Sequence, residues 1–420
     1  MSDQKNLFLA IIASVAILMG FQLFYELPRE EARQAALKRQ EQMQQQQPAT
    51  PGTETAAPVP LPGGGAVPQA GQAAPAQAAV PTREGAIAAA PRLKIEGKRV
   101  HGSISLRGGR IDDITLADYR VDTKPGSAEI VLFSPAGGPS PYYAEFGWTT
   151  VPGASIRLPG ADADWTADRP ALKAGEPVTL SWNNGEGLIF QRIIAIDENY
   201  LFTVTQRVKN ESGAPVTLFP YGLISRHGTP TTLGFYILHE GPLAVLQDKL
   251  IEHSYSDLRE KGRLTQESTG GWIGITDKYW LAALVPDQKQ PVQASFAHTL
   301  AGANENRYQV DFLGEGMVVA PGASVETRAR LFAGAKETNL IDAYEANYDI
   351  RRFDLSIDWG WFYFLTKPIF HAIAYLYKLL GNFGLAILGL TVIIKMLFLP
   401  LAYKSYVAMS AMKKLQPKMM

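Results

Sequence analysis

Residues 383–401 read FGLAILGLTVIIKMLFLPL, an apolar run that contains one charged side chain, Lys395. At about 1.5 Å per residue, a helix of this length covers roughly 28 Å, close to the hydrocarbon thickness of a bilayer. We therefore predict a transmembrane helix over 381–402. A cation inside such a helix is costly, and intramembrane charges are functional-site candidates. The alternative is that Lys395, about 9 Å from Leu401, extends its ammonium group to the nearer membrane surface.

A second apolar segment, LFLAIIASVAILMGFQLF, lies at residues 7–24. It is either a cleaved signal peptide or a membrane anchor. A signal peptide has small residues after its apolar core, whereas this core continues into Tyr25, Glu26 and Leu27. We predict an uncleaved transmembrane anchor over 1–27.

The residues after the Lys395 run indicate the orientation in the membrane. Residues 403–420 contain no acidic residue and four lysines, which are Lys404, Lys413, Lys414 and Lys418. Positively charged loops remain in the cytoplasm. With two spans, the N-terminus is then also cytoplasmic and the part between the spans is exported. The mixed charges on either side of the first span do not set an orientation by themselves.

The composition agrees with an exported middle part. The 420 residues include 40 Lys+Arg, 40 Asp+Glu and no cysteine, so disulfides and thiolate metal sites are excluded. The balanced charge argues against a protein that binds nucleic acid. No residue pattern predicts a cofactor.

A linker is predicted over 28–91. From Gln40 to Pro91 it consists mainly of Gln, Ala, Pro and Gly and has almost no large apolar side chains. Such a segment cannot bury enough surface to fold, so we predict a disordered tether. A Pro-rich ligand for another protein is the alternative.

Beyond the linker the apolar residues alternate, as in strands. Residues 103–107 and 110–116 flank the turn Gly108–Gly109 and read as a hairpin, and Val178, Leu180 and Trp182 alternate before Asn183. Similar short runs recur as far as Ala333 without interleaved helical patterns. We predict an antiparallel β-sandwich over 92–348, closed by a short helix at 337–347.

Candidate chemistry within this domain is sparse. His227 and the His239–Glu240 pair could act as an acid and a base in a sugar-binding cleft. Their spacing matches no motif, so ordinary loop or strand-edge residues are the simpler interpretation. Asp112–Asp113 lacks the further oxygen ligands of a calcium loop.

Residues 354–380 form an aromatic segment that includes Trp359, Trp361 and Tyr375. Amphipathic aromatic side chains prefer the headgroup level of a membrane. Lys367, Pro368 and further polar residues interrupt the segment, and proline is better placed at a helix start. We predict an interfacial helix on the outer membrane surface; a third span is the alternative.

The basic tail over 403–420 predicts the start of a cytoplasmic helix. Met409, Met412 and Leu415 recur at intervals of three and would form one apolar face beside the lysines. A basic segment that only flanks the membrane would explain the lysines equally well.

Three stretches between Asp354 and Lys418 carry a family resemblance: DLSIDWGWFYFLTKPIF, GNFGLAILGLTVIIK and PLAYKSYVAMSAMKKLQPK. In order and spacing they resemble the start of the conserved core of the YidC family (YidC/Oxa/Alb) of membrane protein insertases in its Gram-negative form. Stretches such as GGRIDDITLADY and ENYLFTVTQRVKN are similar to the periplasmic part of the same family, so the resemblance covers nearly the whole chain.

The resemblance implies a chaperone of the bacterial inner membrane and no enzyme. In the family a basic residue on the first core helix lies in a hydrophilic groove and attracts the polar part of a client, and Lys395 occupies this position, where arginine is frequent. Lysine keeps the charge but lacks the planar fork of arginine, so it would act as a point charge. The implied roles of the other residues are cytoplasmic basic contacts for Lys404, Lys413, Lys414 and Lys418 and client-facing apolar contacts for Met409 and Met412.

The implied partners are nascent membrane proteins, the Sec translocon with its accessory subunits, the ribosome and the lipid bilayer, but no nucleic acid. The family continues through further core helices that wall the groove, so we expect either a fragment of a longer chain or a partner that supplies them. Two other classes remain open: a membrane-tethered periplasmic protein that binds or epimerises carbohydrate, and a structural interaction module.

Overall fold

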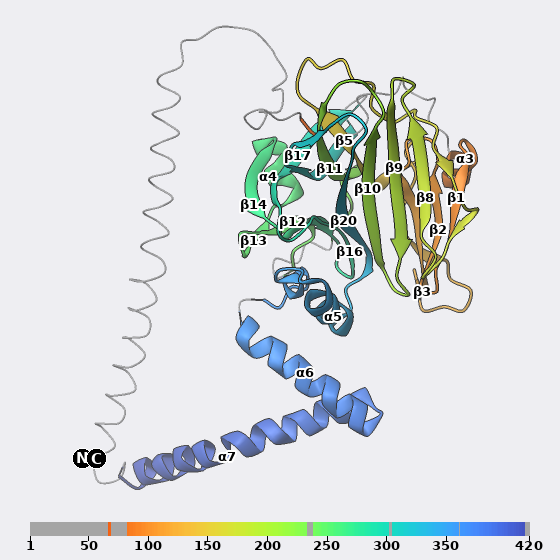
Figure 1. Ribbon diagram of the computed structural model, residues 1–420. Coiled ribbons are helices and arrows are strands. Elements are labelled where there is room, and N and C mark those ends of the chain that lie inside the picture. The colour runs from red at the N-terminus through yellow and green to blue at the C-terminus, as the bar shows by residue number, and fades with distance from the viewer. Residues whose placement is uncertain (1–65, 69–81, 233–237, 302–304, 361, 416–420) are drawn as a thin grey trace, which may run out of the picture. The chain divides into compact units, whose positions relative to one another are not determined.

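The computed structural model describes residues 66–68, 82–232, 238–301, 305–360 and 362–415, and these fall into two compact units (Figure 1). One unit, which ends at Tyr363, contains the strands, and the other contains the two long helices near the C-terminus. The predicted anchor over 1–27 lies outside the described residues.

Strands form where apolar residues alternate, because successive side chains of a strand point to opposite faces. β9 (Leu188–Ile196) is the clearest case, since every second residue from Leu188 to Ile196 is buried. It pairs antiparallel with β10 (Leu201–Asn210), with Ile194 opposite Val204. The Asp197 carboxylate closes the turn between them by accepting hydrogen bonds from the amides of Asn199 (2.9 Å) and Leu201 (3.0 Å).

The strands form two sheets. The 11-stranded sheet runs through β14 (Leu264–Thr269), β17 (Pro291–Ala301), β18 (Glu305–Gly314), β11 (Val216–His227), β5 (Tyr142–Thr150), β3 (Ile111–Arg120), β2 (Val100–Ser105), β1 (Arg92–Glu96) and β7 (Ala171–Leu172), with β19 (Met317–Val319) beside β11 and β4 (Glu129–Phe133) beside β3. The 9-stranded sheet runs through β13 (Lys249–Glu252), β12 (Gly241–Leu246), β15 (Trp272–Thr276), β16 (Trp280–Val285), β20 (Ser324–Ala335), β10, β9, β8 (Val178–Asn183) and β6 (Thr166–Ala167).

The prediction of a β-sandwich is confirmed, with one exception to its antiparallel pairing. All ladders between the described strands are antiparallel except that of β1 with the two-residue β7. The hairpin around Gly108–Gly109 is also present as β2 and β3, although its first strand ends at Ser105. Both glycines have positive φ (75° and 65°), which explains why the turn requires them.

One core fills the space between the sheets and extends to residues after the last strand. Trp272 of β15 and Phe332 of β20 each lie 5.5 Å, ring centroid to ring centroid, from Phe353, and all three rings are fully buried. Phe353 belongs to the 3₁₀ turn η2 (Phe353–Ser356), and Ile350 just before it is also fully buried. The folded domain therefore continues past the predicted boundary at residue 348.

A buried arginine joins the two sheets. Arg192 of β9 donates hydrogen bonds to the carbonyl oxygens of Gly109 (Nη1, 2.5 Å), in the turn between β2 and β3, and of Phe146 (Nη2), on β5 of the 11-stranded sheet. Its guanidinium lies 4.6 Å from the ring of Trp165. Burial lowers the pKa of Arg192. A Cβ on Gly109 would lie 2.4 Å from Arg192 Nη1, so the glycine is needed for this contact as well as for the turn.

Among its described residues, the sandwich unit has three short α-helices, and two of them were not predicted. α3 (Arg83–Ala88) lies inside the predicted disordered linker; Thr82 caps it, and Arg83 forms an ion pair with Asp113. Ordered structure thus begins by Thr82, ten residues before the predicted domain boundary. α4 (Tyr255–Lys261) interrupts the strands, contrary to expectation, and a capping box of Ser254 with Asp257 begins it. The predicted closing helix is present as α5 (Thr338–Tyr348).

The second unit contains α6 (Tyr363–Leu380) and α7 (Phe383–Leu415). The segment predicted as one helix over 354–380 is therefore η2, a connection and α6. Pro368 lies inside α6 rather than at its start, so one backbone hydrogen bond is missing there. The helices over 381–402 and 403–420 are one continuous helix as far as Leu415, because Pro400 does not end it.

Candidate functional site

Lys395 lies on α7, the helix that the apolar run predicted. The segment Phe383–Ser410 of α7 is the only stretch of the described residues that is long and apolar enough to cross a membrane. Lys395 is exposed on this helix, and none of the ion pairs among the described residues includes it. No described carboxylate therefore neutralises the one charge in the middle of the apolar segment.

The position of each residue around α7 follows from about 100° of rotation per residue. Thr391 precedes Lys395 by four residues, so it lies within about 40° of it, and its hydroxyl donates to the Ile387 carbonyl (2.9 Å). Met409 follows Lys395 by fourteen residues, so it also points within about 40° of the direction of Lys395 around the helix axis. It is exposed and lies one to two turns before the end of α7. Lys404 lies about 180° from Lys395, on the opposite side.

Of the predicted basic contacts, only the side chain of Lys404 is among the described residues, and it lies on the side of α7 opposite Lys395. Lys404 is exposed on α7. Met412, Lys413 and Lys414 belong to the last turns of α7, but their side chains lie outside the described part of the chain, and so does Lys418 altogether.

A tight connection positions α7 against α6. Gly381, with φ of 66°, ends α6 by donating its amide to the Tyr377 carbonyl (2.8 Å), and the Asn382 side chain accepts from the Leu385 amide (3.1 Å) to begin α7. Ala386 on the first turn is fully buried although most of α7 is exposed. Small residues at this point allow the two helices to approach closely.

The two histidine positions considered for acid–base chemistry are separate. His227, at the end of β11, packs against the Tyr143 ring, and its Nδ1 lies 3.9 Å from a Glu305 carboxylate oxygen. His239, just before β12, donates its amide to Asp358 (3.1 Å) and contacts the Pro242 carbonyl through Nε2 (3.1 Å). The described contacts of the two histidines have no residue in common.

His227 makes the domain sensitive to acid. Burial, together with the nearby cations Arg307 and Arg110, lowers the pKa of His227 from 6.5 to about 4. Glu305 is half exposed and offsets this little. Between pH 4 and pH 6.5 the folded state therefore binds fewer protons than the unfolded state. The stabilisation of the folded state by neutral His227 is complete above pH 6.5 and is lost as the pH falls towards 4.

We expect His227→Gln to reduce this sensitivity. Between pH 7.5 and pH 5 the free energy of unfolding of the sandwich should fall by about 2 kcal/mol more in the natural chain than in the variant. Urea titrations followed by tryptophan fluorescence at both pH values measure this. His101→Gln, at the exposed position of the largely buried strand β2, is the control and should keep the natural pH dependence. Equal pH dependence in His227→Gln and the natural chain would contradict the assignment.

Asp112 and Asp113 have structural partners. Asp112 forms an ion pair with Arg92 of β1, and Asp113 forms one with Arg83 of α3 and accepts a hydrogen bond from Ser103 (2.6 Å). Burial raises the pKa of Asp112 to about 6 in spite of Arg92. Among the described residues, no cluster of three or more His, Asp or Glu side chains is arranged to hold a metal ion.

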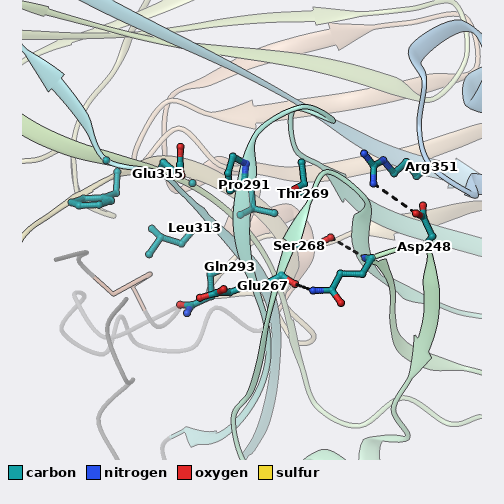
Figure 2. Close-up of a pocket in the computed structure, with 14 residues that line it drawn as sticks. Asp248, Glu267, Ser268, Thr269, Pro291, Gln293, Leu313, Glu315 and Arg351 are labelled. Atoms are coloured by element: carbon teal, nitrogen blue, oxygen red, sulfur yellow. Dashed lines mark hydrogen bonds and ion pairs between the residues drawn. The ribbon is translucent and has the colours of Figure 1, made fainter. Parts of the chain in front are cut away.

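A cavity of about 910 Å³ lies at one end of the 11-stranded sheet (Figure 2). The turn between β12 and β13 forms one side, where Gln247 and Asp248 have positive φ. Gln247 donates to Ser268 Oγ and to the Glu267 carbonyl (both 3.0 Å), and Asp248 lies 3.8 Å from Arg351. These polar groups of the cavity wall thus contact one another.

The sequence patterns missed the polar side chains that the sandwich buries. Arg192 stands at an inward position of β9, where the alternation predicts an apolar residue. Gln309 and Asp311 are also buried, but on the face of β18 opposite the core residues Tyr308, Val310 and Phe312. A charged residue in register with buried apolar residues is the signal that could have found Arg192.

These features define a class of protein: a membrane protein that combines a large β-sandwich with at least one apolar helix, α7, long enough to span a membrane. Residues 92–372 match the family of the YidC periplasmic domain, and residues 375–420 match the 60Kd inner membrane protein family. The chain therefore belongs to the YidC family, as the resemblance predicted.

Relatives match the whole chain. The membrane protein insertase YidC of Methylobacterium radiotolerans is 46% identical over 429 residues, which cover 100% of this chain and 69% of the relative. That of Bradyrhizobium diazoefficiens is 45% identical with the same coverage. A galactose mutarotase related enzyme of Lactobacillus acidophilus has a similar solved structure, with 13% identity and a TM-score of 0.40 over 58% of this chain and 97% of that chain. A TM-score below 0.5 is too low to transfer a fold or an activity.

Proposed function

We propose that the chain provides the periplasmic domain and the first core helix of a membrane protein insertase, which inserts integral proteins into the bacterial inner membrane and helps them fold. The observation that carries this is Lys395, an exposed cation without a described ionic partner inside the apolar helix α7. Intramembrane charges are retained where they contact a polar path or ligand. The insertase relatives, at 45–46% identity, support the same function.

The depth of Lys395 favours a groove over a snorkelling side chain. Lys395 is twelve residues from Phe383 and nine from Lys404, the next charge, so it lies about 18 Å and about 13 Å from these points along the helix axis. The two axial distances together are close to the roughly 30 Å thickness of the hydrocarbon core, so Lys395 would lie near the middle of the membrane. We propose that further helices and water surround this charge, because a lone helix forms no groove.

The proposed partners follow from this location. Clients are nascent membrane proteins whose polar or acidic segments pass Lys395, and the bilayer surrounds α7. Sec translocon subunits and a ribosome would meet the cytoplasmic basic residues Lys404, Lys413, Lys414 and Lys418. Met409 and Met412 are proposed as soft apolar contacts for clients, since methionine adapts to varied surfaces. No nucleic acid is bound directly.

α6 is proposed to lie along the membrane surface, with the anchor over 1–27 in the membrane. α6 exposes Phe364, Phe370, Tyr375 and Tyr377, aromatic residues of the kind that favour the headgroup region. At 18 residues α6 is long enough for a span but, unlike α7, it is not apolar enough, which supports the interfacial position over a third span.

Insertion into liposomes tests the function. The protein, purified together with whatever further helices its gene encodes, is expected to insert a small client with an acidic translocated segment, as measured by protease protection, whereas liposomes without it should not. Turnover of an aldose by the same preparation without insertion would instead support the carbohydrate-active alternative, for which the separate environments of His227 and His239 offer no support.

The orientation gives a separate prediction. The N-terminus and 403–420 should be cytoplasmic and the sandwich periplasmic, because the basic tail after α7 has no acidic residue. Alkaline phosphatase fused after Ala333 should be active, and the same enzyme fused after Met420 should be inactive. The opposite pair of activities would overturn this topology.

A further inference from the structure

One face of the 11-stranded sheet points away from the core but is nevertheless buried. On β5, Tyr142 and Ala144 belong to the core between the sheets, so Tyr143 points to the other face. Tyr143 is 1% exposed, and it forms a separate apolar cluster with Tyr221 and Leu223 of β11, Phe219 and Leu313. Apolar side chains on an outer face require a cover.

Part of the cover is a segment of the predicted tether. Val67 is 3% exposed and packs within this second cluster. The next residue, Pro68, accepts a hydrogen bond at its carbonyl oxygen from Gln309 Nε2 (3.3 Å) on β18. Val67 is more than twenty residues from β1 in the sequence, so this contact is tertiary.

A series of hydrogen-bonded polar side chains orients Gln309, which donates to the Pro68 carbonyl. Gln309 Nε2 also donates to Asp311 Oδ2 (2.8 Å), and Asp311 Oδ1 accepts from Arg263 Nη2 (2.9 Å). Asp311 is fully buried. The Gln309 amide is thereby oriented with its donor towards the Pro68 carbonyl.

The residues around Val67, which we call the seat (Tyr143, Phe219, Tyr221, Leu223 and Leu313), fit an extended segment that contains proline. Pro68 itself is exposed and contacts the sheet through its carbonyl oxygen, while its ring restricts the preceding residue, the buried Val67, to extended backbone. Tyr143, Phe219 and Tyr221 supply the aromatic surface on which Pro-rich extended peptides are recognised. Phe219 and Leu313 also line the cavity of about 910 Å³, so open space continues from the seat along the sheet end (Figure 2).

We infer that the outer face of the 11-stranded sheet is a peptide-binding groove for an extended Val-Pro segment, and that the chain's own tether occupies it through Val67 and Pro68. The tether contains the dipeptide three times, at 59–60, 67–68 and 80–81.

Cysteine accessibility tests the seat, because the natural chain has no cysteine. Val67→Cys, Val59→Cys and Val80→Cys each place one thiol in a Val-Pro dipeptide of the full chain, and cysteine is itself a small apolar residue. In detergent, a soluble maleimide should modify Val67→Cys at least about tenfold more slowly than the other two, because an enclosed thiol reacts only when it is exposed. Equal rates in the three folded proteins, with equal rates in urea, would overturn the inference.

Competition tests the ligand class. A synthetic peptide with the sequence of residues 63–70, GGGAVPQA, should accelerate modification of Val67→Cys several-fold at concentrations above about 1 mM, the effective concentration of a short tether. The same peptide with aspartate in place of valine should not. Phe219→Ser in the Val67→Cys chain should also expose the thiol while the melting curve of the sandwich remains cooperative. No acceleration by the Val-Pro peptide, or the same acceleration by both peptides, would overturn the assigned ligand.

Discussion

Lys395→Ala is expected to impair the insertion of clients with acidic translocated segments, whereas Lys395→Arg should retain most of the activity. A client carboxylate near 4 Å from the ammonium gains about 1 kcal/mol in bulk water and about 4 kcal/mol in a partly desolvated site. Loss of that attraction corresponds to a decrease of roughly fivefold to several-hundredfold in client capture. Arginine restores the charge and adds donors, so it should serve at least as well.

Abundance and a matched control distinguish the groove from snorkelling. Removing an intramembrane cation favours helix insertion by about 2.5 to 3.5 kcal/mol, so the alanine variant should accumulate normally. Lys404→Ala removes a charge on the opposite side of α7. In liposomes that contain neither a Sec translocon nor a ribosome, its proposed partners, we expect this variant to insert acidic clients nearly as well as the natural chain. Insertion rates and crosslinks from position 395 measure the difference. Full activity of Lys395→Ala with several acidic clients would end the charged-groove proposal.

Local patterns predicted the elements whose formation depends on local chemistry. Alternation along β9 gave a strand because the inward residues are buried as a set. Gly108–Gly109 marked a turn because both residues adopt positive φ. The apolar run around Lys395 predicted α7. The helix continues past Pro400 as far as Leu415.

Tertiary contacts account for what the patterns missed. α4 has seven residues and only Tyr255 and Leu258 buried, too few for a helical period to be visible. The tether composition predicts disorder, yet Val67 is buried because distant strands present an aromatic surface to it. Strand order also escaped prediction: β11 lies between β5 and β18, which are far from it in the sequence.

The domain boundary is the clearest case of a tertiary determinant. Nothing local distinguishes residues 349–357 from a linker, since α5 ends at Asp349 in a left-handed conformation. Ile350 and Phe353 are nevertheless fully buried, and the Phe353 ring contacts both Trp272 and Phe332. The predicted domain 92–348 therefore omits part of its own core.

A fragment of residues 82–358 should consequently be much more stable than one of residues 92–348. Burial of an Ile or Phe side chain contributes about 1.5 to 3 kcal/mol, and loss of Phe353 leaves a cavity beside Trp272. Together with loss of the Arg83–Asp113 ion pair, the shorter fragment should lose about 5 kcal/mol. That is comparable to the whole stability of a small domain, so we expect it to be largely unfolded or to melt far lower.

A single substitution tests the contribution of buried Phe353 to stability without truncating the chain. Phe353→Ala in residues 82–358 should cost about 3 to 5 kcal/mol in urea titrations, whereas Val121→Ala, at a position 68% exposed, should cost less than about 0.5 kcal/mol. Equal stability of the two fragments, or of Phe353→Ala and the unsubstituted fragment, would show that residues 349–357 dock without contributing to the core. The domain would then end at Tyr348, and the connection to α6 would be free to move with the membrane helices rather than with the sandwich.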